Sequence, residues 1–332
     1  MLLVDRSQDV VEIAVKSTTR NRTRMALPEF LDPRLTERRN PRSARIDVAT
    51  SLEIVDLMNA EDRTVPEVVH RQRLEIARVI DLVVDRFRRG GRLVYVGAGT
   101  SGRLGVLDAT ECPPTFGTPP EMVVGIIAGG PEALTRSREG AEDDEAAARE
   151  ALEAHRVNDR DVVVGVAASG TTPFVHAALL RASNLGAATA LVTCTEPPEE
   201  LARAVEVAIV APVGPEVLTG STRLKAGTAT KLILNAISTG AMIGSGRAYG
   251  NLMVDLMALS AKLRDRGERI VMEACAVGRD EARRAIEEAG GSVKLAIVMV
   301  RREVDAERAR RLLEEAGGVV RRAAGDPPPV VE

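Results

Sequence analysis

The sequence contains no tryptophan, and aromatic residues make up only 2% of its 332 positions. Surfaces that stack single-stranded nucleic acid depend on aromatic side chains, so this scarcity argues against such a surface. A strongly basic composition is missing as well, because 45 Lys and Arg residues are balanced by 48 Asp and Glu residues. We therefore expect no nucleic-acid partner.

Cysteine is also sparse, since Cys112, Cys194 and Cys275 are the only three in the chain. An odd number at wide spacing is not a disulfide framework, and reduced cysteines are typical of a cytoplasmic protein. The three histidines share no zinc-ligand spacing with the cysteines, so no metal site is expected. No apolar run reaches about 18 residues, which argues against a membrane span.

Short apolar runs alternate with helical patterns in the middle of the chain. We expect strands at residues 92–96, 122–127, 161–167, 187–193 and 205–210. Helices are expected at 131–155 with a break at Gly140, at 173–184 and at 222–242. This alternation predicts an α/β fold, a parallel sheet between two helical layers in a three-layer αβα sandwich.

The flanking regions differ in composition from this middle part. We expect a flexible N-terminal extension at 1–35, a catalytic domain at 36–266, a helical C-terminal module at 267–324 and a disordered tail at 325–332. Helical periodicity begins at Ser51, and a second helix is expected to start at Thr64, with Glu67 completing a capping box, and to stop at Gly90.

Two loops rich in glycine and hydroxyl residues follow predicted strands and open predicted helices. The first contains Gly99, Thr100 and Ser101, and the second contains Ser169, Gly170, Thr171 and Thr172. Backbone amides and hydroxyl groups at a helix start suit a phosphate group. Because both loops follow parallel strands, we expect them to converge on one phosphorylated ligand. Neither loop continues into the Gly-Lys-Ser/Thr run of a nucleotide-binding P-loop.

The loops resemble those of sugar isomerase (SIS) domains, and a longer segment resembles a narrower family. Residues 97–117 read GAGTSGRLGVLDATECPPTFG and are similar to N-acetylmuramic acid 6-phosphate etherases. Further support comes from LTERRNP at 35–41, AEDD at 141–144, STRLKAGT at 221–228 and GNLMVD at 250–255. The resemblance implies a SIS fold, a three-helix UBA-like C-terminal module and a homodimer.

The resemblance also implies a reaction, cleavage of the D-lactyl ether of N-acetylmuramate 6-phosphate during cell-wall recycling. An alkoxide leaves poorly, but the open-chain aldehyde acidifies the C2 hydrogen, so a base can drive elimination of lactate before water adds back. This chemistry needs an acid and a base but no cofactor. The family pattern assigns Glu111 as the acid and Glu142 as the base.

The remaining candidates are weaker. Ser221 and Lys225 resemble a third substrate-binding segment, although Ser221 or Thr222 could equally cap the following helix. Arg103 could bind phosphate or could be a surface residue of the first helical turn. Cys112 lacks a neighbouring histidine in the sequence, so we expect it to be a packing residue and not a nucleophile.

Three other functions stay open at this point. A sugar-phosphate sensor would use the same loops without an acid–base pair. An aldose–ketose isomerase would share proton abstraction at C2 but keep the substituent at C3. A nicotinamide-dependent dehydrogenase is suggested only by the spacing of Gly97, Gly99 and Gly102.

Overall fold

In the computed structural model, residues 34–256 and 261–327 are described. The predicted extension up to residue 33 and the predicted tail beyond residue 327 lie outside them. One parallel sheet has the strand order β2-β1-β3-β4-β5. Its strands are β1 (Leu93–Gly97), β2 (Val123–Ile127), β3 (Val162–Val166), β4 (Ala188–Thr193) and β5 (Val207–Val210).

Valine-rich sequence explains why these segments are strands. Every residue of β1, β3 and β4 is buried, as expected for central strands that are covered on both faces. All five strands predicted from the sequence are present, with ends that differ by one or two residues. The parallel sheet is therefore confirmed.

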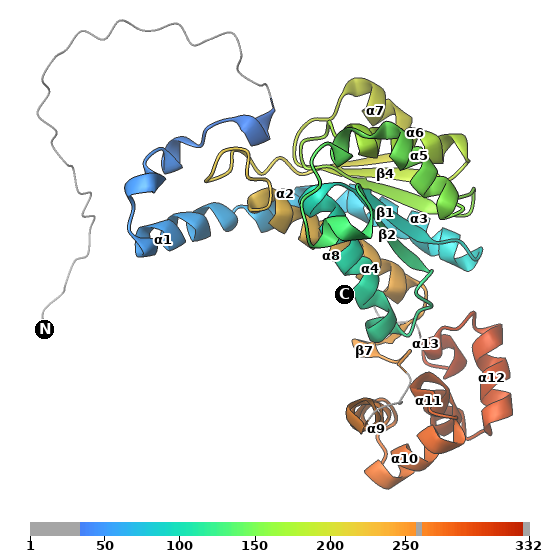
Figure 1. Ribbon diagram of the computed structural model, residues 1–332. Helices are drawn as coiled ribbons and strands as arrows, with labels where there is room; N and C mark the ends of the chain where they lie inside the picture. Colours follow the sequence, from blue (N-terminus) through green and yellow to red (C-terminus); the bar gives the residue numbers. More distant parts are fainter. Residues whose placement is uncertain (1–33, 257–260, 328–332) are drawn as a thin grey trace, which may run out of the picture. The chain divides into compact units, whose positions relative to one another are not determined.

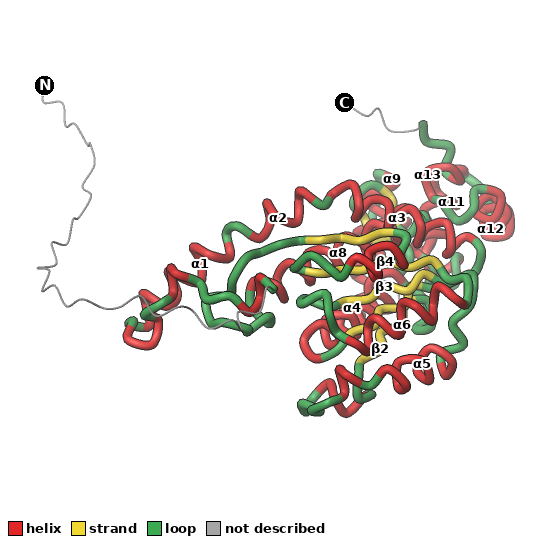
Figure 2. The backbone as a smooth tube through the Cα atoms, turned by 90° about the horizontal axis from the view of Figure 1, so that it is seen from above, coloured by secondary structure: helices red, strands yellow, loops and turns green. Residues whose placement is uncertain are grey.

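Helices cover both faces of the sheet (Figures 1 and 2). Hydrophobic side chains of α3 (Arg73–Arg88), α4 (Gly99–Phe116) and α8 (Lys225–Gly244) pack on one face. Those of α5 (Glu145–Ala154), α6 (Pro173–Asn184) and α7 (Glu199–Ala204) pack on the other. The three-layer αβα sandwich predicted from the sequence is confirmed.

Two helix predictions are wrong in detail. Residues 131–155 contain two 3-10 turns, η4 (Pro131–Leu134) and η5 (Ala141–Asp143), before α5 begins. The expected helix from Thr64 is broken at Gln72 into α2 (Val65–Arg71) and α3. Thr64 makes no capping bond. The capping box instead begins α1 (Ser51–Asp62), where the Thr50 hydroxyl accepts from the Glu53 amide.

The polar segment 34–48 is ordered by contacts far along the chain. It contains the short turns η1 (Leu35–Glu37), η2 (Pro41–Ser43) and η3 (Ile46–Val48). Thr36 and Asn40 are buried. The Gly220 amide donates to the Thr36 carbonyl at 3.1 Å, and the Asn40 side chain donates to the Pro215 carbonyl at 3.2 Å.

The C-terminal part has a hydrophobic core of its own, which includes Val254, Val271 and Ile297. A short hairpin of β6 (Ala248–Tyr249) and β7 (Leu252–Met253) leads into it. Within the described residues this helical part contains five helices: α9 (Ala261–Cys275), α10 (Arg279–Glu288), α11 (Val293–Arg302), α12 (Ala306–Glu315) and α13 (Val320–Ala323).

Residues at both expected boundaries of this module take part in defined structure. The composition shift at residue 267 lies inside α9, because charged side chains already cover the outer face of the preceding turns. At the other end, Asp326 is bonded to Tyr249 and Arg301, so the described end of the expected tail is held in place. Among the described residues, no helix is long and apolar enough to cross a membrane.

Candidate active site

The strand order reverses direction between β1 and β3, which are neighbours in the sheet. The chain proceeds from β1 to β2 on one side and from β3 to β4 and β5 on the other. Gly97 at the end of β1 lies opposite Val166 at the end of β3. Ligands of open α/β sheets bind at such a switch point, beyond the carboxyl ends of the strands. Both predicted loops therefore leave neighbouring strands at the same edge of the sheet.

Glycines bring the first loop close to its helix. A Cβ on Gly97 would lie 2.7 Å from the Gly102 nitrogen, and one on Gly102 would lie 2.6 Å from the Gly97 oxygen. Gly99, the first residue of α4, has a positive φ of 52°. Thr100 and Ser101 are half-buried in the first turn of the helix. The glycines thus let the strand turn sharply into α4 beside these hydroxyl groups.

The second loop is closed by bonds between its own hydroxyl residues. The Thr171 amide and the Thr171 hydroxyl both donate to Ser169 Oγ, at 3.3 and 3.2 Å. Gly170 has a φ of 69°, in the left-handed region that favours glycine. Thr172 precedes α6 without making a side-chain cap. Ser169, Thr171 and Thr172 are all half-buried at the start of this helix.

Three further residues support the second loop and were missed from the sequence. The Thr195 hydroxyl donates to the Ser169 carbonyl at 2.6 Å, and the Thr193 hydroxyl donates to the Thr195 carbonyl at 3.0 Å. His176 Nε2 lies 2.8 Å from the Gly170 carbonyl oxygen, so the bond requires a proton on Nε2. The position of Thr193 and Thr195, at and just after the end of β4 in the same sheet, could have revealed them.

The third predicted segment is only partly available to a ligand. Ser221 is half-buried in the turn before α8. Lys225 is 3% exposed, and its ammonium group lies 2.6 Å from the Glu61 carboxylate. The expectation that Lys225 binds substrate is therefore not met, because burial in this ion pair commits its charge.

Neither Ser221 nor Thr222 caps α8. The buried Glu216 carboxylate instead accepts from the amides of Lys225 and Ala226, at 3.0 and 2.9 Å. Burial is the largest influence on the Glu216 carboxyl and raises its pKa above the ordinary value, despite these two bonds. The carboxylate of Glu216, in the loop before α8, thus caps the helix in place of the Ser221 or Thr222 hydroxyl considered from the sequence.

Glu142 lies beside the first loop. It is exposed in η5 and lines a hollow of about 340 Å³ together with Gly99, Ala128 and Arg103. The Arg103 guanidinium donates to the carbonyls of Ala133 and Leu134, at 2.8 and 3.0 Å, so it fastens η4 to α4. The structure thus brings one predicted carboxylate to the phosphate-type loop.

Glu111 lies elsewhere in the same chain. It follows Gly99 by twelve residues on α4, and a helical rise of 1.5 Å per residue separates them by about 18 Å. Glu111 is exposed and does not line the hollow that contains Gly99 and Glu142. A single chain does not bring the two predicted carboxylates together.

The inner face of α4 beside Glu111 is polar but buried. The Tyr95 hydroxyl donates to Asp108 at 3.0 Å, and Lys231 lies 3.5 Å from the same carboxylate. Burial, the largest influence, raises the pKa of the Cys112 thiol to about 12. Cys112 is also 2% exposed and belongs to the hydrophobic core on this face of the sheet, so the packing role expected for it is confirmed.

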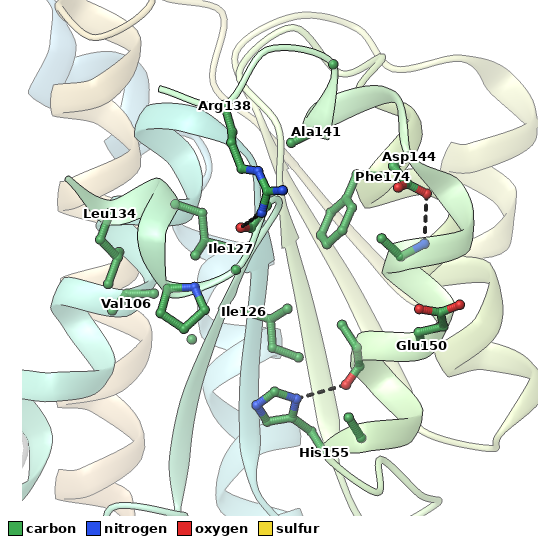
Figure 3. A pocket seen from close by; sticks show the side chains of 18 of the residues that line it. Val106, Ile126, Ile127, Leu134, Arg138, Ala141, Asp144, Glu150, His155 and Phe174 are labelled. Carbon is green, nitrogen blue, oxygen red and sulfur yellow. Dashed lines mark hydrogen bonds between the residues drawn. The ribbon is translucent and has the colours of Figure 1, made fainter. Parts of the chain in front are cut away.

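A larger cavity of about 720 Å³ opens at the β2 edge of the sheet (Figure 3). Val106, Ile126, Leu134 and Phe174 form apolar walls, and Arg138 donates to the Gly129 carbonyl at 3.0 Å. No residue of either hydroxyl loop lines it. The size of this cavity therefore does not identify it as the phosphate site, because the residues of both hydroxyl loops lie outside it.

Comparison with known proteins gives three results. A family model described as the glucokinase regulatory protein N-terminal SIS domain matches residues 75–183. An N-acetylmuramic acid 6-phosphate etherase from Geobacillus thermodenitrificans is 51% identical over 82% of this chain and 92% of that protein. One from Symbiobacterium thermophilum is 54% identical over 80% of this chain and 87% of that protein.

Among solved structures, a phosphoheptose isomerase from Francisella tularensis is similar with a TM-score of 0.46 and 16% identity. The structural match covers 59% of this chain and 100% of the isomerase chain.

Proposed function

The chain belongs to the N-acetylmuramic acid 6-phosphate etherase family, and from this premise we propose how its residues perform the reaction. The enzyme cleaves the lactyl ether of N-acetylmuramate 6-phosphate and releases N-acetylglucosamine 6-phosphate and D-lactate. The observation that carries this assignment is the match of over 50% identity along four fifths of the chain. The two hydroxyl loops at the β1/β3 switch point supply a site for the phosphate.

The two loops anchor the sugar phosphate. Hydroxyl groups and backbone amides of Ser169, Thr171 and Thr172, with those of Thr100, Ser101 and Ser221, bind the phosphate and sugar oxygens, while Gly99 and Gly170 let the backbone approach. A ligand anchored at its C6 phosphate presents its open-chain aldehyde at a fixed distance from the loops. The position of Glu142 in the hollow that contains Gly99 supports Glu142 as the base that removes the C2 proton.

The electron pair of the C2–H bond forms the C2=C3 double bond, and the C3–O bond breaks. Glu111 then donates a proton to the departing lactate oxygen. Water adds its hydroxyl group at C3 and gives its proton to Glu111, while Glu142 returns its proton to C2. This gives the product and restores both carboxyl groups. Glu111 is exposed and lies twelve residues from Gly99 along α4. This supports a site in which Glu111 comes from a second copy of the chain and Glu142 from the first.

Exposed apolar side chains support such a homodimer. Leu107 on α4, one helical turn before Glu111, and Leu232 on the neighbouring α8 are 44% and 37% exposed. On α1, Leu52 and Val55 are 70% and 52% exposed. Helix faces of this kind are normally covered, and a second copy would bury them and enclose Glu111.

The competing functions lack comparable support. A sensor would not need carboxylates at the family's acid–base positions, and an isomerase would retain the lactyl group. The glycine spacing that suggested a dehydrogenase is explained by the close contact of Gly97 with Gly102. The free thiols of Cys112, Cys194 and Cys275 support a cytoplasmic location. The separate hydrophobic core around Val271 supports a C-terminal module that is a domain of its own.

Lactate release in deuterated water tests the reaction. The enzyme is incubated with N-acetylmuramate 6-phosphate, lactate is quantified, and the sugar product is analysed by mass spectrometry. We expect lactate together with one deuterium at C2 of N-acetylglucosamine 6-phosphate. Deuterium at C2 without lactate would point to an isomerase or to a failed acid step, and sugar-phosphate binding with neither signal would favour a sensor.

A further inference from the structure

A phosphate dianion is normally bound with the help of a cationic side chain, and the two cations nominated by the sequence are engaged elsewhere. Lys225 is buried against Glu61. The Arg103 guanidinium donates to two backbone carbonyls of η4. The hydroxyl loops by themselves therefore supply dipoles but no full positive charge.

Arg34 brings a guanidinium to the second loop from a distant part of the sequence. Its Nη1 donates to Thr171 Oγ1 at 3.1 Å across 137 residues of chain. The same Thr171 hydroxyl donates in turn to Ser169 Oγ, so the three side chains form one connected group. A guanidinium has five N–H donors in a rigid plane, a geometry that matches phosphate oxygens.

The backbone beside Arg34 is held in place by the contacts of the segment 34–48. Thr36 and Asn40 are bonded to the loop that precedes α8. Arg42 adds an ion pair of 2.9 Å to Glu61, which itself pairs with Lys225. The segment that carries Arg34 is thus tied to the loop before α8 and to Glu61 at several points.

We propose that Arg34 binds the 6-phosphate of the substrate, as a charged partner to Ser169 and Thr171. This inference rests on the proposed function, because it assigns a further residue to the substrate of that same site. The phosphate takes no part in bond breaking, so Arg34 contributes equally to binding the substrate and the transition state. Its loss therefore raises KM and leaves kcat nearly unchanged.

Binding of the product N-acetylglucosamine 6-phosphate, measured by calorimetry, tests the assignment without requiring turnover. We expect Arg34→Gln to weaken this binding by about ten- to a hundred-fold, the range for a charge-assisted hydrogen bond, with Arg34→Lys between the two. Arg39→Gln is the matched control, because it removes the same charge from an exposed position of the same segment. A thermal melt of each variant reports on folding.

A kinetic experiment compares kcat/KM for lactate release from phosphorylated and from unphosphorylated N-acetylmuramate. Arg34→Gln is expected to lower kcat/KM for the phosphorylated sugar and to leave the value for the unphosphorylated sugar unchanged. A loss of the same size for both sugars would overturn the proposal and indicate a structural role.

Three binding results would also overturn it. Arg34→Gln could bind the product as tightly as wild type. It could lose affinity only for N-acetylmuramate 6-phosphate, which would mean that the guanidinium faces the lactyl carboxylate. The Arg39→Gln control could weaken product binding as much as Arg34→Gln does. The loss of affinity would then follow from the removal of any positive charge in this segment and not from a contact made by Arg34. Failure of the proposed function is distinguishable, because wild type would then release no lactate, whatever Arg34 does to binding.

Discussion

Replacing Lys225 by methionine tests whether this residue is structural or binds substrate. The side chains of Lys225 and Glu61 are 4% and 8% exposed, so the substitution leaves a nearly buried carboxylate without its closest cation. Breaking a buried pair from one side costs about 3 to 5 kcal/mol. Glu61 keeps Arg42 at 2.9 Å, so we expect Lys225→Met to lose about 3 kcal/mol of stability, at the low end of that range.

The double variant Glu61→Leu with Lys225→Met separates the two interpretations. An apolar pair of similar volume has no uncompensated charge, so its stability is expected to return to within about 1 kcal/mol of wild type. Arg42 is 57% exposed and can be solvated without Glu61. Glu216 keeps the two backbone amides that donate to it.

Urea denaturation followed by circular dichroism measures these differences, since the chain has no tryptophan to report by fluorescence. The folded double variant should bind N-acetylglucosamine 6-phosphate within a few-fold of wild type. A stable double variant that has lost this affinity would show that Lys225 contacts the ligand. Equal stability of wild type and Lys225→Met would refute the energetic reasoning.

The same pair has a pH dependence. Burial, the largest single influence, raises the pKa of Glu61, but hydrogen bonds and charges from Lys225, Asn40 and Arg42 together lower it below 4.5. A lowered folded pKa means stability that is present at neutral pH and lost as pH falls through the folded pKa. The stability difference between wild type and Lys225→Met is therefore expected to shrink as pH falls toward the lowered folded pKa of Glu61, because protonation removes the carboxylate charge in both proteins.

Three further changes test other parts of the account. Gly102→Ala would place a Cβ 2.6 Å from the Gly97 oxygen, so we expect a loss of about 2 kcal/mol in urea denaturation and weaker sugar-phosphate binding; unchanged values would contradict the close packing of the first loop. Cys112→Ala should keep lactate release within a few-fold, and loss of release from a folded variant would reinstate the thiol as a catalytic group. Glu111→Gln should abolish lactate release while calorimetry shows product binding unchanged; full activity would exclude Glu111 as the acid.

Local sequence patterns predicted the layers and both loops. Each strand is a short run of mainly apolar residues, and each loop is a glycine and hydroxyl cluster directly after such a run. These signals depend on neighbours in the chain, so no tertiary information is needed to read them. The helical break at Gln72 was missed because the apolar face continues across it. The change in composition was placed at Gly267, although α9 begins at Ala261 and its first turns are already rich in charged residues.

Contacts between distant residues could not be predicted in the same way. Lys225 pairs with Glu61 across 164 residues, and Arg34 with Thr171 across 137. No local pattern distinguishes a buried lysine from one that binds phosphate, because the partner decides its role. The separation of Glu111 from its own loops was accessible from the sequence, since helical rise alone over twelve residues gives about 18 Å.

The central claim is that Glu142 and Glu111 of different chains act in one site. Glu111→Gln and Glu142→Gln are each inactive under this account. Co-refolding equal amounts of the two gives half mixed dimers, in which one site of two has both carboxylates. Lactate release should then recover to about a quarter of the wild-type value, by the symmetry of a two-fold dimer. A mixture in which mixed dimers are verified by mass spectrometry, yet which releases no lactate, would contradict the claim.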